Sequence, residues 1–256
     1  MSSYESFAEV YDDLMDEVPY EEWGTYIKNY LAGAGILDGL MLELGCGTGK
    51  MMRLMSAFGY DMIGVDSSEQ MLQIAQDKVG DERERFLYLL QDMRSFELYG
   101  TVACVISVCD SINYITDPDD LRQVFRLVNN YLDPEGIFLF DFNTEYKYME
   151  LIGERVIAED REDVSFIWYN EYDQKNHLNY IDLSVFVREN DDRYRKFTEE
   201  HLQRGYTLEE IKKLLEESGL VFIEAFDGYS REKAGDHSER ILVAARENGK
   251  NRGRQI

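Results

Sequence analysis

The chain has 256 residues, and its 27 basic against 51 acidic side chains give a net charge of −24. Because so acidic a surface repels phosphate groups, the composition argues against a nucleic-acid binder and against docking on an anionic membrane. An apolar fraction of 44% is enough for a packed core and excludes a disordered chain. No apolar run is long enough to cross a bilayer, and the first residues are acidic where a signal peptide is basic.

The three cysteines, Cys46, Cys104 and Cys109, are an odd number, and two of them lie in an apolar run. This pattern indicates a reduced, cytoplasmic protein without disulfides. The chain has 3 histidines and no paired Cys–His spacing, so we expect no metal site.

Residues 1–35 are predicted to form a helical cap, because their apolar residues recur three or four positions apart. From Leu40 onward, short apolar runs alternate with helical stretches. The runs are Leu40–Leu44, Met62–Val65, Phe86–Leu90, Val102–Val108 and Ile137–Phe142. Their continuous apolar character is typical of strands buried on both faces of a parallel sheet. The alternation of strands and helices predicts an α/β fold with a doubly wound sheet.

The pattern changes between residues 144 and 205, where apolar residues alternate with polar ones. Ile181, Leu183, Val185 and Val187 share one face of a predicted strand, and turns are expected at 173–176 and 190–192. Three or four antiparallel strands therefore form an inserted β subdomain. The parent domain comprises residues 1–143 and 206–247, and the polar tail 248–256 is expected to fray.

Several residues mark where the helices begin and end. Ser67 with Gln70, and Thr207 with Glu210, have the spacing of capping boxes. Asp117 precedes a proline that would occupy the first helical position. Gly219 is expected to end the last helix, and the segments 220–226 and 241–245 form the final pair of strands.

A glycine loop follows the first predicted strand, with the sequence Glu43-Leu44-Gly45-Cys46-Gly47-Thr48-Gly49. Glycines there let backbone N–H groups approach a ligand at a helix N-terminus. The loop is neither a phosphate loop, since Met51 follows Lys50, nor a dinucleotide fingerprint, since Lys50 replaces its last glycine. What remains is GxGxG with an acid two residues before it, and a tight turn without a ligand stays the alternative.

Polar residues also follow the next three strands. Asp66 ends the second strand and could accept hydrogen bonds from both hydroxyls of a ribose, although a helix cap is the alternative. Asp92 and Met93 follow the third strand and could contact an adenine, although an ordinary exposed acid in a turn is the alternative. After the fourth strand comes the polar cluster Cys109–Tyr114, where a substrate would meet a cofactor.

These motifs resemble those of class I S-adenosylmethionine-dependent methyltransferases, and the resemblance extends from about Tyr4 to Arg246. It implies a Rossmann-like seven-stranded sheet whose last strand is antiparallel. It assigns Gly45, Gly47 and Gly49 to the methionine end of S-adenosyl-L-methionine, Asp66 to the ribose, and Asp92 and Met93 to the adenine. We expect further cofactor contacts from a wider set of residues, namely Tyr11, Trp23, Glu43, Cys46, Ser67, Met71 and Cys109.

Methyl transfer from a sulfonium is an in-line displacement for which the protein supplies orientation and excludes water. A base is needed only when the nucleophile is protonated. The candidate catalytic residues are Tyr11, Asp110, Asn113 and His201, although Tyr11 could be a packing residue and His201 a surface residue. An anionic acceptor would need a group of basic residues near the cluster, and the cluster itself contains none. The candidates elsewhere are Arg94, Arg122 and Arg204, so the acceptor is predicted to be neutral or cationic.

The leading interpretation is transfer of a methyl group to a nitrogen or oxygen of a small molecule, with release of S-adenosyl-L-homocysteine. The segment after the fourth strand has neither the NPPY-type motif of adenine and glutamine amide methylases nor a catalytic cysteine pair, which argues against those substrates. A tRNA- or RNA-base methyltransferase, a non-catalytic S-adenosylmethionine-binding module and a dehydrogenase remain as alternatives. The chain is expected to be a monomer or a homodimer.

Overall fold

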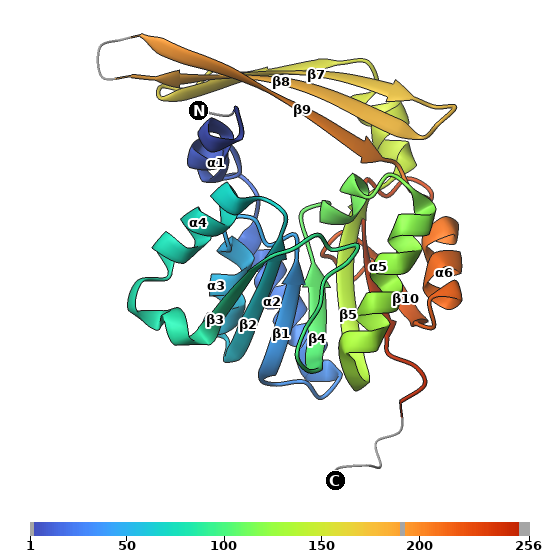
Figure 1. Cartoon of the computed structure of the whole chain (residues 1–256). Helices are drawn as coiled ribbons and strands as arrows, with labels where there is room; N and C mark the ends of the chain where they lie inside the picture. Colours follow the sequence, from blue (N-terminus) through green and yellow to red (C-terminus); the bar gives the residue numbers. More distant parts are fainter. Residues whose placement is uncertain (1–2, 190–192, 251–256) are drawn as a thin grey trace.

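The computed structural model describes residues 3–189 and 193–250. A seven-stranded sheet forms its centre, in the order β10-β11-β5-β4-β1-β2-β3 (Figure 1). The strands are β1 (Gly39–Leu44), β2 (Tyr60–Asp66), β3 (Phe86–Leu90), β4 (Val102–Ser107), β5 (Leu132–Asn143), β10 (Val221–Asp227) and β11 (Arg240–Arg246). Strands β1 to β5 pair in parallel, and β11 runs antiparallel to both β5 and β10. The predicted Rossmann-like sheet with its antiparallel last strand is therefore confirmed.

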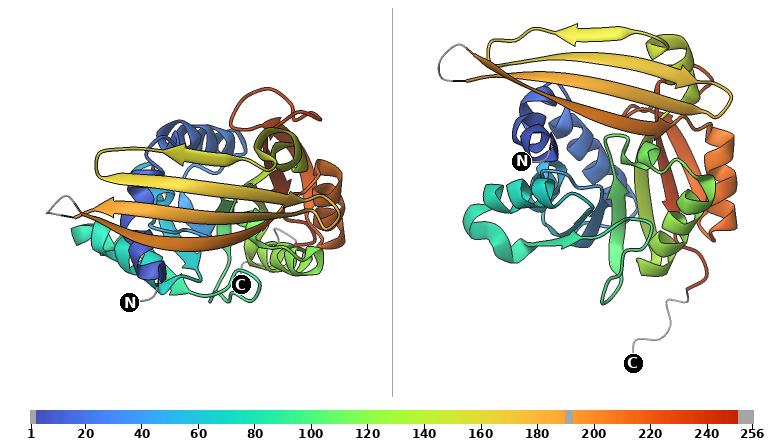
Figure 2. Two further views of the ribbon diagram at one scale, coloured as in Figure 1. Left: turned by 90° about the horizontal axis from the view of Figure 1, so that it is seen from above. Right: turned by 45° about the horizontal axis from the view of Figure 1, so that its top comes forward.

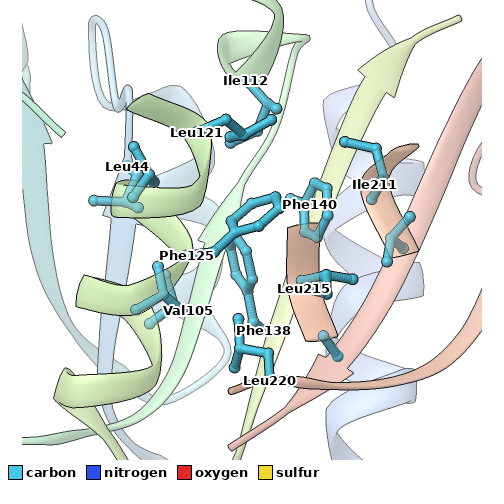
Figure 3. Close-up of a cluster of buried hydrophobic side chains, with 14 of the residues drawn as sticks. Leu44, Val105, Ile112, Leu121, Phe125, Phe138, Phe140, Ile211, Leu215 and Leu220 are labelled. Carbon is cyan, nitrogen blue, oxygen red and sulfur yellow. The ribbon is translucent and has the colours of Figure 1, made fainter. Parts of the chain in front are cut away.

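Helices cover both faces of this sheet. One face packs against α2 (Tyr20–Gly33), α3 (Lys50–Ala57) and α4 (Glu69–Lys78), and the other against α5 (Pro118–Tyr131) and α6 (Leu208–Glu217). Between α5 and β5, Phe125 lies against Phe138 and Phe140, with ring centroids 5.8 and 5.2 Å away (Figure 3). Because both faces are covered, the central strands are mostly apolar, which is why they appear as short apolar runs in the sequence.

The helix starts agree with the sequence at two of three places. Asp117 accepts a hydrogen bond from Asp119 at the start of α5, and Thr207 with Glu210 forms a complete capping box on α6. At α4 the prediction was one residue off, because Ser68 and not Ser67 caps the helix. The reason is that Asp66 already holds the N–H of Ser68 at 2.8 Å, which keeps the chain extended for one residue more.

The segment between β5 and α6 forms a separate four-stranded antiparallel sheet, ordered β6-β7-β8-β9, which we call the roof. Its strands are β6 (Val156–Glu159), β7 (Val164–Asp173), β8 (Leu178–Arg188) and β9 (Tyr194–Arg204). The predicted turn at 173–176 is present, with Asp173 accepting hydrogen bonds from the N–H groups of Lys175 and Asn176. The other predicted turn, at 190–192, lies outside the described residues. Figures 1 and 2 show the roof lying across the end of the central sheet at which the parallel strands finish.

Helix α1 (Ser3–Leu14) lies between the roof and α4 (Figure 1). Val10 packs against Val164 and Val185 on the underside of the roof, so the strand face that the sequence predicted to be apolar is the covered one. On its other side, Asp12 accepts a hydrogen bond from Thr48 at 2.6 Å and pairs with Lys78. Helix α1 thus connects the roof to the loop that follows β1.

Three short helical turns complete the fold. They are the 3₁₀ turns η1 (Gly80–Arg85) and η2 (Ser111–Tyr114) and the π-helical turn η3 (Lys147–Ile152). The predicted frayed tail is wrong for residues 248–250, because Lys250 donates hydrogen bonds to the carbonyls of Asn129 and Asn130 at 2.8 Å. Residues 251–256 lie outside the described residues. Among the described residues, no helix is long and apolar enough to cross a membrane.

Candidate functional site

The chain reverses its direction of travel across the sheet at β1, which has β2 on one side and β4 on the other. In open α/β sheets, ligands bind in the crevice that opens at such a point, beyond the carboxyl ends of the strands. Here those ends carry the glycine loop after β1, Asp66 at the end of β2, and Cys109 and Asp110 after β4. The predicted motifs therefore meet at one crevice, and the roof covers it.

Two glycines of the loop serve different purposes. All three of Gly45, Gly47 and Gly49 have positive φ angles, of 72°, 52° and 71°. A Cβ atom on Gly45 would lie 2.6 Å from the Oγ of Ser111, so the fold itself requires that glycine. A Cβ atom on Gly47 would meet nothing within 4 Å. The face of Gly47 is thus open, as a loop that receives a ligand needs.

Asp66 ties the glycine loop to the end of β2. One carboxylate oxygen accepts the N–H of Gly47 at 2.8 Å and the other accepts the N–H of Ser68 at 2.8 Å. Burial raises the pKa of Asp66, and these backbone hydrogen bonds oppose that shift. Each oxygen can accept a further hydrogen bond, so the carboxylate can still receive two hydroxyls.

Glu43 lies behind the loop and is only 2% exposed. Its Oε2 is buried and has no hydrogen-bond partner among the described residues. Burial raises the pKa of Glu43 well above its usual value, and the nearby charge of Asp66 adds to the shift. A buried carboxyl group with an unsatisfied oxygen, next to an open glycine loop, suits a ligand that carries a positive charge or amine donors. A cofactor with an amino group and a sulfonium fits this arrangement.

The other predicted cofactor residues lie around this crevice in different ways. Met93 rests against the loop, with its methyl carbon 3.5 Å from the Cβ position of Gly45. Asp92 is engaged by Arg94, whose Nε lies 2.9 Å away and which lowers the pKa of the carboxyl group. Cys46 is buried with its sulfur against Gly64, so only its backbone faces the loop. The N–H of Met71 is used in capping α4.

Beyond β4, two successive non-glycine residues adopt left-handed backbone angles, Cys109 with φ 57° and Asp110 with φ 52°. Such a conformation is strained and persists only where its surroundings fix it. Both N–H groups donate to the carboxylate of Asp141, at 3.1 and 2.7 Å, and Asp141 is fully buried at the end of β5. The loop that carries Asp110 is therefore held rigidly at the crevice.

Arg240, at the start of β11, joins the two acids. Its guanidinium contacts Asp141 at 2.6 Å and Asp110 at 2.7 Å. Gln203 from the roof donates to the other oxygen of Asp110 at 2.8 Å, and the hydroxyl of Tyr148 donates to Gln203 at 2.8 Å. This network, which contains residues from β5, β11, η3 and the roof, fixes the carboxylate of Asp110.

Lys147 lies beside this network, and its Nζ donates to the side-chain oxygen of Asn143 at 3.0 Å. The sequence offered Arg94, Arg122 and Arg204 as the cations near the cluster Cys109–Tyr114. The structure instead brings Lys147 and Arg240 there. Arg204, which the sequence offered instead, pairs with Glu210 at 3.4 Å and lies over the ring of Tyr206. Arg240 could not be found from spacing, because it stands 130 positions after Asp110.

Asn113 does not have the predicted role of contacting an acceptor. It is fully buried, and its amide nitrogen donates to the carbonyls of Asn143 and Arg204, both at 2.8 Å. Its oxygen accepts the N–H of Asn143 at 2.8 Å. With its donors used, Asn113 fastens the end of β5 and the end of the roof to the loop after β4.

Aromatic and thiol groups pack together beside the loop after β4. The thiol of Cys109 donates to the hydroxyl of Tyr20 at 3.3 Å, and Tyr11 hydrogen-bonds to the same hydroxyl. Burial raises the pKa of Tyr11 well above its usual value, so its hydroxyl stays protonated. The ring of Trp23 stacks on Tyr229, with centroids 4.3 Å apart. Trp23 thus lies toward β11, next to Arg240.

His201 reaches the crevice from the underside of the roof. Its Nδ1 lies 3.3 Å from the hydroxyl of Tyr114, and its ring is 5.6 Å from that of Phe7 on α1. Burial lowers the pKa of His201, and the charge of Asp110 opposes this only in part. The imidazole is therefore neutral at pH 7 and able to accept a proton.

We predict that Arg240→Met destabilises the protein by about 3–5 kcal/mol, because it leaves the buried carboxylate of Asp141 without its counter-ion. Urea denaturation measures this change, and the exposed Arg246→Met on the same strand is the matched control. Adding Asp141→Asn to Arg240→Met should restore part of the loss. Equal stability of the two single variants would show that the ion pair is not needed.

Comparison with known proteins agrees with this geometry. A protein family described as "Methyltransferase domain" matches residues 41–136. A relative from Bacillus subtilis (strain 168) that is named as a methyltransferase, YqeM, is 34% identical over 244 residues, which are 94% of this chain and 96% of the relative. The crystal structure of an S-adenosylmethionine-dependent methyltransferase from Clostridium acetobutylicum ATCC 824 is 30% identical, covers 97% of this chain and 100% of its own, and has a TM-score of 0.88.

More distant structures share the fold. The CcbJ methyltransferase from Streptomyces caelestis is 19% identical, covers 95% of this chain and 96% of its own, and has a TM-score of 0.79. Because two of these relatives are at least 30% identical to the chain and match nearly its whole length, the protein belongs to the S-adenosylmethionine-dependent methyltransferases.

Proposed function

We propose that the protein transfers the methyl group of S-adenosylmethionine to a nitrogen or oxygen of a small molecule held beneath the roof. One observation carries this proposal. The roof brings His201 and Gln203 of β9 against Tyr114 and Asp110 of the loop after β4, so that polar side chains of the roof meet the end of a parallel strand. The net charge of −24 favours a small acceptor over a polyanion such as RNA.

The cofactor half of the crevice is formed by the ends of β1 and β2. In this proposal the open face of Gly47 receives the methionine end, Asp66 accepts the ribose hydroxyls, and Met93 lies along the adenine. Glu43 compensates positive charge from behind the loop. When bound, S-adenosylmethionine supplies a methyl group already activated by its positively charged sulfur.

The acceptor half is formed by the loop after β4 and the roof. Its rigid network keeps Asp110 in one place, so an acceptor bound there meets a fixed carboxylate and not a mobile one. The neutral imidazole of His201 can take the proton that the nucleophile loses. The roof excludes water, which strengthens each of these polar contacts.

Glycine-loop variants separate folding from ligand binding. Gly47→Val should abolish binding of S-adenosylhomocysteine measured by calorimetry, while destabilising the fold by only about 1–2 kcal/mol for its left-handed backbone. Gly45→Val should lower the thermal midpoint much further, because its Cβ would clash with Ser111. Retained affinity in Gly47→Val would refute the assignment of this loop to the cofactor.

For Asp66→Ala, we expect S-adenosylhomocysteine binding to weaken by about 2–3 kcal/mol, because the carboxylate orders the loop and accepts charge-assisted hydrogen bonds. The exposed Asp77→Ala on α4 is the control and should bind normally. The ribose assignment fails if calorimetry finds the same affinity for both variants.

The pH profile tests His201. Because the pKa of His201 lies below its usual value of about 6.5, the neutral base persists into mildly acidic solution, and kcat should fall only as pH drops through that lower pKa. His201→Ala should reduce kcat by about 10²–10⁴-fold and remove this acid limb. The exposed His237→Ala should keep both rate and limb, and an unchanged profile in His201→Ala would exclude the base role.

A further inference from the structure

Lys147 is a charged residue of the acceptor half that the proposed reaction does not yet use. It is the first residue of η3, the π-helical turn directly after β5, and such turns are frequent at functional sites. Its side chain is partly buried and turned back over the end of β5, where its Nζ meets the side-chain oxygen of Asn143 at 3.0 Å. Among the described residues, that neutral amide is the only hydrogen-bond partner of the Nζ.

The charge of Lys147 has no counter-ion in contact. Among the described residues, no carboxylate lies within 4 Å of its Nζ, and both Asp110 and Asp141 are already paired with Arg240. Burial lowers the pKa of Lys147, and the charge of Arg240 lowers it further. Asp110, Glu239 and Asp141 act in the opposite direction without offsetting this shift. A partly buried ammonium in this position would be stabilised by an anion that a ligand brings.

Position separates Lys147 from the cofactor. In the sheet, β4 lies between β5 and β1, so the end of β5 is about 10 Å from the glycine loop across two strand spacings. Asp66, at the end of β2, is one strand farther still. An anion bound by Lys147 therefore belongs to the acceptor and not to the methionine end of the cofactor.

We propose that the methyl acceptor carries a carboxylate, and that Lys147 binds it while the nucleophile faces the loop of Asp110. This inference rests on the proposed function and narrows its substrate class. Arg240 is shared between Asp110 and Asp141, so Lys147 is the cation left to bind a negative group of the acceptor. An acceptor with a carboxylate replaces the expectation, made from the sequence, of a neutral or cationic acceptor.

Binding of a matched pair of probes tests this without turnover. Benzoate and benzamide are titrated by calorimetry into the complex of the chain with S-adenosylhomocysteine. Benzoate should bind about 10- to 100-fold more tightly than benzamide, as a charge-assisted contact allows. Lys147→Met should erase this preference, Lys147→Arg should keep part of it, and the exposed Lys175→Met should leave it unchanged. Equal binding of the two probes to the unmodified chain would overturn the inference.

The pH dependence is a second readout. Benzoate needs the protonated ammonium, so its affinity should fall as pH rises through the pKa of Lys147, which lies below its usual value near 10.5. Lys147→Met should lack this dependence. S-adenosylhomocysteine should bind Lys147→Met as it binds the unmodified chain, and a loss of about 10-fold would assign Lys147 to the carboxylate of the cofactor instead.

A turnover experiment separates this inference from the proposed function. The chain is incubated with labelled S-adenosylmethionine and a dialysable bacterial extract, and the labelled product is treated with a carbodiimide and an amine. A mass shift from amide formation shows the carboxylate and supports the inference, whereas a labelled product without an acidic group overturns it. If no small molecule is labelled, the proposed function fails, and the benzoate titration still decides the role of Lys147.

Discussion

The contact on which the acceptor half depends is that of Asp141 with Arg240. A carboxylate that is fully buried must be neutralised, and Asp141 is neutralised by one guanidinium, two backbone N–H groups and the hydroxyl of Tyr229. The same hydrogen bonds hold Cys109 and Asp110 in their left-handed conformation. The antiparallel last strand of the sheet is thus part of the site, because it delivers Arg240 to the end of β5.

Hydrogen bonds connect the roof to the loop that carries Cys109 and Asp110. Gln203 reaches Asp110, and Asn113 holds the carbonyl of Arg204, so the last strand of the roof is positioned on the loop after β4. Helix α1 fills the space beneath the roof and touches the glycine loop through Asp12 and Thr48. The glycine loop, α1 and the roof therefore form a continuous series of contacts around the crevice. Such an enclosure suits a reaction from which water must be excluded.

The features that could be predicted from the sequence are those that depend on residues close together in the chain. Short apolar runs located five strands, and alternation located the roof. The glycine loop and Asp66 do meet at the ends of β1 and β2, as predicted, and their contact with a cofactor stays a prediction. Arg240 and Lys147 escaped prediction because the pairing of β11 with β5, and the turn after β5, bring them to a loop far away in the chain. Asn113 was misjudged because a polar cluster in a sequence does not show which member becomes buried.

The acids beside the glycine loop bear on product release in the proposed reaction. Glu43 and Asp66 are acids whose pKa burial raises, so a cation bound next to them is favoured and stabilises their charged forms. Transfer of the methyl group removes the positive charge from the sulfur, and the neutral thioether loses that attraction. In the proposed arrangement, the acidic half therefore attracts the positively charged S-adenosylmethionine more strongly than its neutral product. In that arrangement, the loss of charge in the chemical step favours exchange of the product for a fresh cofactor.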